Sequence, residues 1–196
     1  MPGISLSLMT SPIQQALIFR FLSRAFAFPN LAFVPELREA AKTIDDHRQT
    51  LSALIALFEN ANMELLQAEY TRLFINGYPN TPCPPYESVY LEKRMLGEAS
   101  LKVQNAYNQW DMTVDSGLVD HIATEFEFLA FLYSAESINP AIGIEARNSS
   151  SLFIREHICR WVPKFIDDLN NSASIEAYTL LSAIMKTIID QYCMTI

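Results

Sequence analysis

If the segment 119–134 forms a helix, that helix is apolar around nearly its whole circumference. This constrains the fold more than any other part of the chain. A helix on the surface of a protein carries apolar residues on one face, whereas a helix that is apolar all round lies in the middle of a bundle. We therefore predict a central helix here, surrounded by others. Its large apolar side chains are Ile122, Phe126, Phe128, Leu129, Phe131, Leu132 and Tyr133.

The rest of the chain also favours helices. Only five of the 196 residues are glycine, long helix-permitting stretches lie between prolines, and few segments alternate apolar and polar residues. This combination predicts an all-α protein, a single globular bundle of about ten helices. The predicted helices, in chain order, cover residues 12–28, 35–44, 51–58, 63–73, 87–96, 98–110, 119–134, 153–161, 163–169 and 174–193.

Two segments interrupt this pattern. The loop 76–86 contains four prolines, which make it stiff and extended, and a loop of this length in a compact domain is usually functional. The segment 111–119 is polar and contains Gly117. We predict an N-terminal helical lobe (1–110) that carries the proline-rich loop, a hinge at 111–119, and a C-terminal helical lobe (120–196).

The start of the first helix has its own signature. Ser11 is a residue type that caps helices, Pro12 suits the first helical position, and Gln14 predicts a capping box with Ser11.

The net charge of −8 argues against nucleic acid as a partner, because phosphates require a basic face. No Lys or Arg occurs between Lys102 and Arg147. One interpretation of this block is an acidic wall that attracts a basic peptide, and the alternative is a solvated helix face. The acidic residues of the block are Asp111, Asp115, Asp120, Glu125, Glu127, Glu136 and Glu145.

The three cysteines, Cys83, Cys159 and Cys193, are odd in number and their spacing predicts no disulfide framework, which fits a reducing cytoplasm. The segment 1–9 has neither the basic start nor the long apolar run of a signal peptide, and no apolar run elsewhere is long enough for a membrane span. We therefore expect a cytoplasmic protein that does not insert into membranes.

Asp120 and His121 open the predicted central helix. His121 and Glu125 share one face at i,i+4 spacing, and Thr124 and Glu127 lie on the neighbouring face with Asp120. Together they predict a polar, acidic lip at one end of an apolar helix, where a carboxylate can pair with an arginine of a visiting peptide. The alternative for Asp120 is a helix cap.

A second cluster follows the proline-rich loop. Tyr86, Glu87 and Tyr90 form an aromatic surface with polar edges, a common way to hold an apolar peptide segment. The alternative is that the two tyrosines fill the interior. In the segment 153–165, His157 lies one turn before Trp161, and interhelical packing explains that pair best.

The sequence contains no motif of an enzyme. There is no Gly-x-Ser-x-Gly turn and no glycine-rich phosphate loop, and Cys83 lies between prolines without a positioned base. His157 and Cys159 point to different faces of a helix, so a metal site is not predicted. We expect no catalytic residue, no bound metal and no cofactor; the competing hypothesis is an acid/base or metal site made by Asp120, His121 and Glu125.

Three segments together resemble the TorD/DmsD/NarJ family of cytoplasmic chaperones for molybdoenzymes. They are Glu-Tyr-Thr-Arg-Leu-Phe at 69–74 with Pro-Pro-Tyr-Glu-Ser-Val-Tyr at 84–90, the stretch 120–132 that opens on Asp-His, and the stretch 153–165. The resemblance implies an all-helical chaperone, without catalytic activity, that binds the twin-arginine signal peptide or another N-terminal segment of a molybdenum-cofactor oxidoreductase. Such a chaperone holds its client until cofactor is loaded and then releases it for export or assembly.

The residues that match the binding region of the family are Tyr86, Glu87, Ser88, Asp120 and His121, to which the arguments from the residues themselves add Tyr90 and Glu125. Where the family commonly has Glu-Pro shortly before Asp-His, this chain has Gly117 and Leu118. The resemblance also implies that a homodimer can form by domain swapping, which a loose hinge near Gly117 permits. The runner-up function is an assembly adaptor for a respiratory oxidoreductase subunit that lacks a signal peptide.

Overall fold

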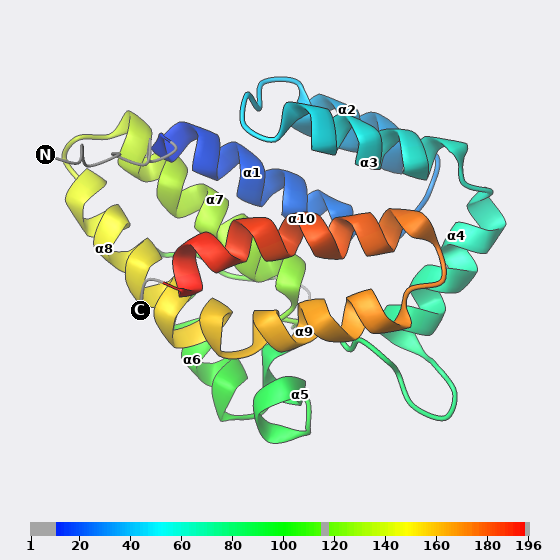
Figure 1. The fold of residues 1–196 in the computed structure, drawn as a ribbon. Coiled ribbons are helices and arrows are strands. Elements are labelled where there is room, and N and C mark those ends of the chain that lie inside the picture. The colour runs from blue at the N-terminus through cyan, green and yellow to red at the C-terminus, as the bar shows by residue number, and fades with distance from the viewer. Residues whose placement is uncertain (1–10, 115–117, 195–196) are drawn as a thin grey trace, which may run out of the picture.

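The computed structural model describes residues 11–114 and 118–194, and within these ranges it contains helices and no β-strand (Figure 1). The predicted all-α bundle is therefore confirmed. In chain order the elements are α1 (Pro12–Ala25), α2 (Phe33–Ala41), α3 (Arg48–Asn60), α4 (Met63–Tyr70), the π-helical turn η1 (Thr71–Ile75), α5 (Glu87–Glu92), α6 (Glu98–Asn108), α7 (Ile122–Ile138), α8 (Gly143–Phe153), the π-helical turn η2 (Ile154–Ile158), α9 (Cys159–Ser172) and α10 (Glu176–Cys193).

Helix α7 is the centre of the bundle, as its sequence predicted. Helix α1 packs lengthwise against it and α8 packs against it as well (Figure 1). The ring of Phe19 on α1 lies 5.7 Å from the rings of both Phe126 and Tyr133 on α7. A helix without a polar face thus buries most of its surface against its neighbours.

The core draws on both predicted lobes. Buried apolar side chains from α1 to α10 form one hydrophobic cluster. Within it Phe26, directly after α1, contacts Phe74 of η1, Phe126 of α7 and Phe165 of α9. The division into lobes at 111–119 stays a prediction, and part of that hinge, 115–117, lies outside the described residues.

Helix α5 ends earlier than predicted, at Glu92 rather than near Leu96. The chain leaves the helix at Lys93, which has a left-handed φ of 61°. The carboxylate of Glu92 then accepts hydrogen bonds from the backbone N–H groups of Glu98 and Ala99, at 3.1 and 2.6 Å. Glu92 therefore caps the N-terminus of α6, a role that requires a turn before it.

The predicted capping box at the start of α1 is wrong. Ser11 is the N-cap residue, but its side chain makes no capping hydrogen bond. The side chain of Gln14 instead donates to the carbonyl of Thr43 at 3.0 Å and accepts from the N–H of Asp45 at 2.8 Å. These backbone groups lie in the connection between α2 and α3, so a tertiary contact takes the place of the local one.

The predicted break at Pro163 is also wrong, since α8, η2 and α9 follow one another without interruption and Pro163 lies inside α9. A proline disrupts the hydrogen bonds between residues four apart, and the π-helical turn η2 directly before α9 already departs from that spacing. The chain therefore continues as a helix past a residue that usually ends one.

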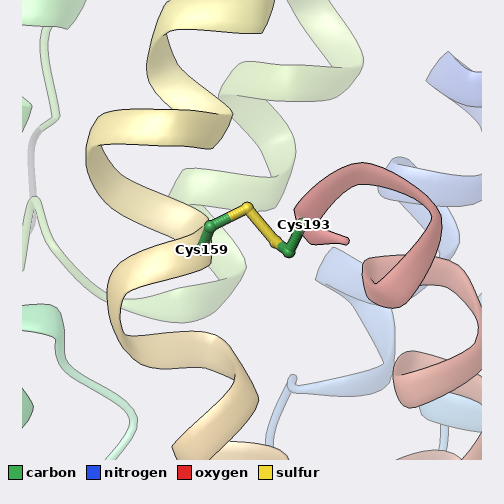
Figure 2. The surroundings of a disulfide bond; sticks show 2 residues. All are labelled: Cys159 and Cys193. Carbon is green, nitrogen blue, oxygen red and sulfur yellow. A yellow bond between two sulfur atoms is a disulfide. The ribbon is translucent and has the colours of Figure 1, made fainter. Parts of the chain in front are cut away.

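Cys159 and Cys193 form a disulfide that joins the start of α9 to the end of α10 (Figure 2). Their Cα atoms are 5.5 Å apart, although the residues are 34 positions apart in sequence. The prediction that no disulfide forms is wrong here, because α9 and α10 form an antiparallel hairpin that brings distant positions together. Cys83 is a buried free cysteine, and burial raises the pKa of its thiol to about 12.

No helix within the described residues has the length and apolar character needed to cross a membrane.

Candidate functional site

The end of the proline-rich loop and the start of α7 lie side by side. Tyr86 and His121 form an isolated antiparallel β-bridge. The N–H of Ile122 donates to the carbonyl of Pro85 at 2.9 Å, and the N–H of Glu87 donates to the carbonyl of Asp120 at 3.0 Å. Two segments that are 35 residues apart in the sequence are thereby held together through their backbones.

Asp120 is 2% exposed and caps a helix other than its own. Its Oδ2 accepts a hydrogen bond from the N–H of Ser88 at 2.8 Å, in the first turn of α5. The N-cap of α7 is His121, whose Nδ1 accepts from the N–H of Ala123 at 3.1 Å. Asp120 is thus a helix cap, as the alternative interpretation expected, but the helix that it caps is α5 and not α7.

His121 is neutral at physiological pH. Burial lowers its pKa to about 4, and the negative charge of Asp120 opposes this shift without cancelling it. Because Nδ1 accepts a hydrogen bond from Ala123, the proton of the neutral imidazole is on Nε2. The ring stands edge-on to that of Tyr86, with 5.2 Å between their centroids.

Three carboxylates, Glu87, Asp120 and Glu125, lie beneath this junction, and we call them the acidic cluster. Glu87 Oε2 is 2.9 Å from Nδ1 of His157, and Glu125 Oε2 accepts from the indole N–H of Trp161 at 3.1 Å. The second oxygen of Glu125 is buried without a hydrogen-bond partner. Burial, and then the charge of Glu87, raise the pKa of Glu125 well above its ordinary value, so its neutral form is favoured.

The accessible part of the site is aromatic. Tyr86, Tyr90 and His121 are each half-buried. The hydroxyl of Tyr90 donates to Oδ2 of Asp168 at 3.2 Å, and its ring lies 5.4 Å from that of Trp161 on α9. Tyrosines and an imidazole therefore cover a layer of buried carboxylates, with Asp168 at the edge.

The acidic lip predicted on α7 is therefore not open at all its positions. Asp120 and Glu125 are buried, and Glu127 lies 3.8 Å from Arg20. Further along the block, Glu136 pairs with Arg147 at 2.7 Å, and Asp115 lies outside the described residues. The acidic residues between Lys102 and Arg147 therefore do not form one exposed acidic wall. An apolar central helix can accommodate acids only where they are buried with partners or lie at its edges.

Sequence reasoning missed three partners of the site. His157 and Trp161 were assigned to packing, whereas they bond to Glu87 and Glu125 from 70 and 36 positions away. Asp168 carried no signal at all. The one available clue was the placement of His157 one turn before Trp161, which puts two hydrogen-bonding side chains on the same face.

A further buried carboxylate, outside the acidic cluster, lies on α4, before the proline-rich loop in the chain. Glu69 accepts two hydrogen bonds from the guanidinium of Arg72, at 2.8 and 2.9 Å. It also accepts from the N–H of Ser174 at 2.6 Å, and Arg72 donates to the carbonyl of Ser172. This pair connects η1 to the loop between α9 and α10.

No group of three or more His, Cys, Asp or Glu side chains with a metal-binding arrangement occurs in residues 11–114 and 118–194.

Comparison with known proteins places the chain in a family. The model of the nitrate reductase delta subunit family matches residues 32–167, which is well over half of the chain. The chain belongs to the nitrate reductase delta subunit family. The resemblance to TorD, DmsD and NarJ proteins deduced from the sequence is thereby confirmed.

Relatives of this chain include proteins called chaperone protein TorD from Vibrio cholerae serotype O1. One, from strain El Tor Inaba N16961, is 26% identical over 144 residues, which are 69% of this chain and 64% of that protein. Another, from strain O395, is 24% identical over 171 residues, which are 83% of this chain and 77% of that protein. The first match thus spans less than two thirds of the relative's length.

The fold has a counterpart in a crystal structure from Archaeoglobus fulgidus, described as that of a redox enzyme maturation protein. The two chains superpose with a TM-score of 0.60 and are 24% identical, over 95% of this chain and 99% of the other. At this identity the match supports the shared helical fold.

Proposed function

We propose that the protein is a cytoplasmic chaperone, without catalytic activity or cofactor of its own, that binds the twin-arginine signal peptide or N-terminal segment of a molybdenum-cofactor oxidoreductase. In this role it supports cofactor insertion and proofreading before export. Its membership of the nitrate reductase delta subunit family and its likeness to chaperone protein TorD support this activity.

The observation that carries the proposal is the junction of Tyr86 with His121 above the acidic cluster. Burial, and then the negative charge of Asp120, raise the pKa of the Tyr86 hydroxyl, so the field of that carboxylate reaches the accessible ring. A guanidinium is weakly hydrated and stacks on aromatic faces, and negative potential beneath the rings strengthens that contact. An arginine-bearing peptide therefore suits this surface better than a neutral one.

The residues divide into two roles under this proposal. Tyr86, Tyr90 and His121 contact the peptide, His121 as a hydrogen-bond donor through Nε2. The buried residues Glu87, Ser88, Asp120 and Glu125 are positioning residues. The hydrogen bond between Ser88 and Asp120 holds α5 against the start of α7, and Glu87 and Glu125 bond to His157 and Trp161. Asp120 supplies negative charge beneath the aromatic rings.

Calorimetric titration tests the proposal directly. The probe is a synthetic peptide with two adjacent arginines followed by an apolar stretch, taken from a molybdoenzyme encoded beside this protein. We expect binding at tens of micromolar or tighter, and at least tenfold weaker binding when both arginines are changed to Ala. Tyr86→Ala should weaken binding, whereas Tyr78→Ala, which removes a 99% exposed tyrosine of the same loop, should not. Equal affinity for both peptides would contradict the proposal.

The alternative function is an assembly adaptor for a respiratory oxidoreductase subunit that lacks a signal peptide. The name of the family, which describes a nitrate reductase subunit, favours this alternative. Affinity purification from the native host distinguishes the two, because an adaptor retains a client without twin arginines.

Domain swapping is a further part of the proposal. Helix α1 packs along α7 across the predicted hinge at 111–119, so an exchange of lobes between two copies reproduces the same contacts. Size-exclusion chromatography with light scattering should then resolve a monomer and a dimer that interconvert slowly.

A further inference from the structure

A pocket of about 310 Å³ opens between α6, α7 and the continuous helix formed by α8, η2 and α9. Its apolar lining includes Ala106, Trp110, Phe128 and Phe153. Tyr86 and Tyr90, the tyrosines of the proposed peptide surface, are not among the residues that line it. The pocket is thus a separate site.

The floor of the pocket is made of rings that hold one another in place. Phe128 and Phe153 are edge-to-face with 5.0 Å between their centroids, and Trp110 is edge-to-face with Phe131 at 5.7 Å. A preformed aromatic floor of this kind favours a flat apolar group. The volume lies at the lower end of the range of small-molecule sites, which fits one or two rings.

The rim of the pocket carries two cations, Lys102 and Arg160, and one carboxylate, that of Glu156. Lys102 pairs with Glu98 at 2.8 Å, and Glu156 pairs with Arg155 at 2.9 Å. Arg160 also lines the pocket, is exposed, and makes no hydrogen bond or contact ion pair with another described residue, although its charge acts on the carboxylate of Glu156 one turn earlier. In a chain with a net charge of −8, an arginine whose N–H groups make no hydrogen bond to a described residue, above an aromatic floor, selects for an anionic group.

The inner wall of the pocket contains His157, whose Nδ1 is bonded to Glu87 of the acidic cluster. The imidazole is therefore fixed in orientation and separates the pocket from that cluster. A ligand on the Arg160 side meets a cation and aromatic rings, whereas a peptide on the Tyr86 side meets rings above carboxylates. The two sites have opposite charge preferences.

We propose that this pocket binds a small aromatic acid of one or two rings with a single carboxylate. The rings lie against Phe128 and Phe153, and the carboxylate accepts hydrogen bonds from the guanidinium of Arg160.

The test uses 2-naphthoate and its neutral isostere 2-naphthamide, titrated by calorimetry into the full chain. We expect 2-naphthoate to bind with one-to-one stoichiometry and 2-naphthamide to bind more weakly. Arg160→Gln should weaken 2-naphthoate about three- to fivefold, the scale of an ion pair near the surface, and leave 2-naphthamide unchanged. Arg24→Gln, which removes another exposed arginine outside the pocket, is the matched control and should change neither affinity.

A second variant tests the volume independently of the charge. Ser149 lines the pocket, and Ser149→Trp should abolish binding of both compounds while thermal melting shows that the protein is folded. Equal affinity for the two compounds, no binding of 2-naphthoate at millimolar concentration, or equal effects of Arg160→Gln and Arg24→Gln would overturn the proposal. So would binding of an acetylated Phe-Glu dipeptide amide where 2-naphthoate fails, since the site would then recognise peptides.

Discussion

Glu69 and Glu125 are both buried carboxylates, and their surroundings shift their pKa values in opposite directions. Burial raises the pKa of Glu69, but the hydrogen bonds from Arg72 and Ser174 outweigh it, and the pKa lies below the ordinary value. Burial also raises the pKa of Glu125, and there the neighbouring charge of Glu87 adds to the effect. Hydrogen bonds offset burial at Glu69, whereas at Glu125 a neighbouring carboxylate adds to it.

The two sites therefore suit different tasks. Glu69 holds η1 against the loop that connects α9 to α10, and each of its oxygens has a partner. Glu125 is buried next to the carboxylates of Glu87 and Asp120, an arrangement that disfavours its charged form. Unfavourable electrostatics of this kind occur where function requires them, and here they lie beneath the surface proposed to bind the peptide.

The largest effect is expected at the stabilising site. Glu69→Ala removes the hydrogen bonds to Arg72 and Ser174, and we expect the free energy of unfolding to fall by about 3 kcal/mol. Urea unfolding measures this change. The matched control is Glu59→Ala, which breaks an exposed pair with Arg38 and should cost less than about 1 kcal/mol. Equal losses in the two variants would remove the basis of the comparison.

Substitutions of Asp120 test whether the acidic cluster also stabilises the fold. Asp120→Ala removes the cap of α5 and should lower the free energy of unfolding by about 1–2 kcal/mol. Asp120→Asn keeps an acceptor for the N–H of Ser88 and should cost less. Both variants should weaken binding of the twin-arginine peptide, because both remove the negative charge. If Asp120→Asn binds like the parent protein, Asp120 acts as a cap alone.

Glu125→Gln should have a smaller effect, and one of opposite sign. Because the pKa of Glu125 is raised on folding, the parent loses stability as the pH rises above the pKa of the unfolded state, near 4.5. The glutamine of the variant does not titrate, so the variant should be more stable than the parent at pH 8. The expected gain in the free energy of unfolding is roughly 1 kcal/mol, the scale of one net hydrogen bond.

The corresponding change at the other site reverses this pH dependence. The lowered pKa of Glu69 contributes stability above pH 4.5 that is lost as the pH falls through the folded pKa. In Glu69→Gln the free energy of unfolding should therefore fall less steeply below pH 4.5 than in the parent. His121 titrates in the parent and in each variant. Because folding lowers its pKa, stability is lost as the pH falls from 6.5 toward 4. Subtracting the stability profile of a variant from that of the parent removes this shared contribution. Parallel difference profiles would show that the two carboxylates do not differ.

Much of the helical architecture follows from local patterns. The central position of α7 and the existence of helices over most of 51–58 and 63–73 were predicted, because the apolar patterns behind them extend over only a few turns of helix. Gln14 shows where such reasoning fails, since a distant backbone segment takes its side chain.

The site was predictable only in part. The family resemblance pointed to both Tyr86 and His121, which the structure joins by a β-bridge. The burial of Asp120 was not predictable, because an acid at the start of a helix is ordinarily solvated. The bond between Glu87 and His157 spans 70 positions, and no periodicity carries information over that distance.

The measurement that tests the account most directly is a map of the peptide-binding surface by amide chemical-shift perturbation. Adding the twin-arginine peptide should shift the amide signals of Tyr86, Tyr90, His121 and Ala123 and leave those of Arg160 and Trp110 unchanged. The same experiment with the two arginines changed to Ala should show much smaller shifts. Perturbations confined to another face, or identical perturbations with both peptides, would contradict the claim that aromatic side chains above the acidic cluster recognise arginine.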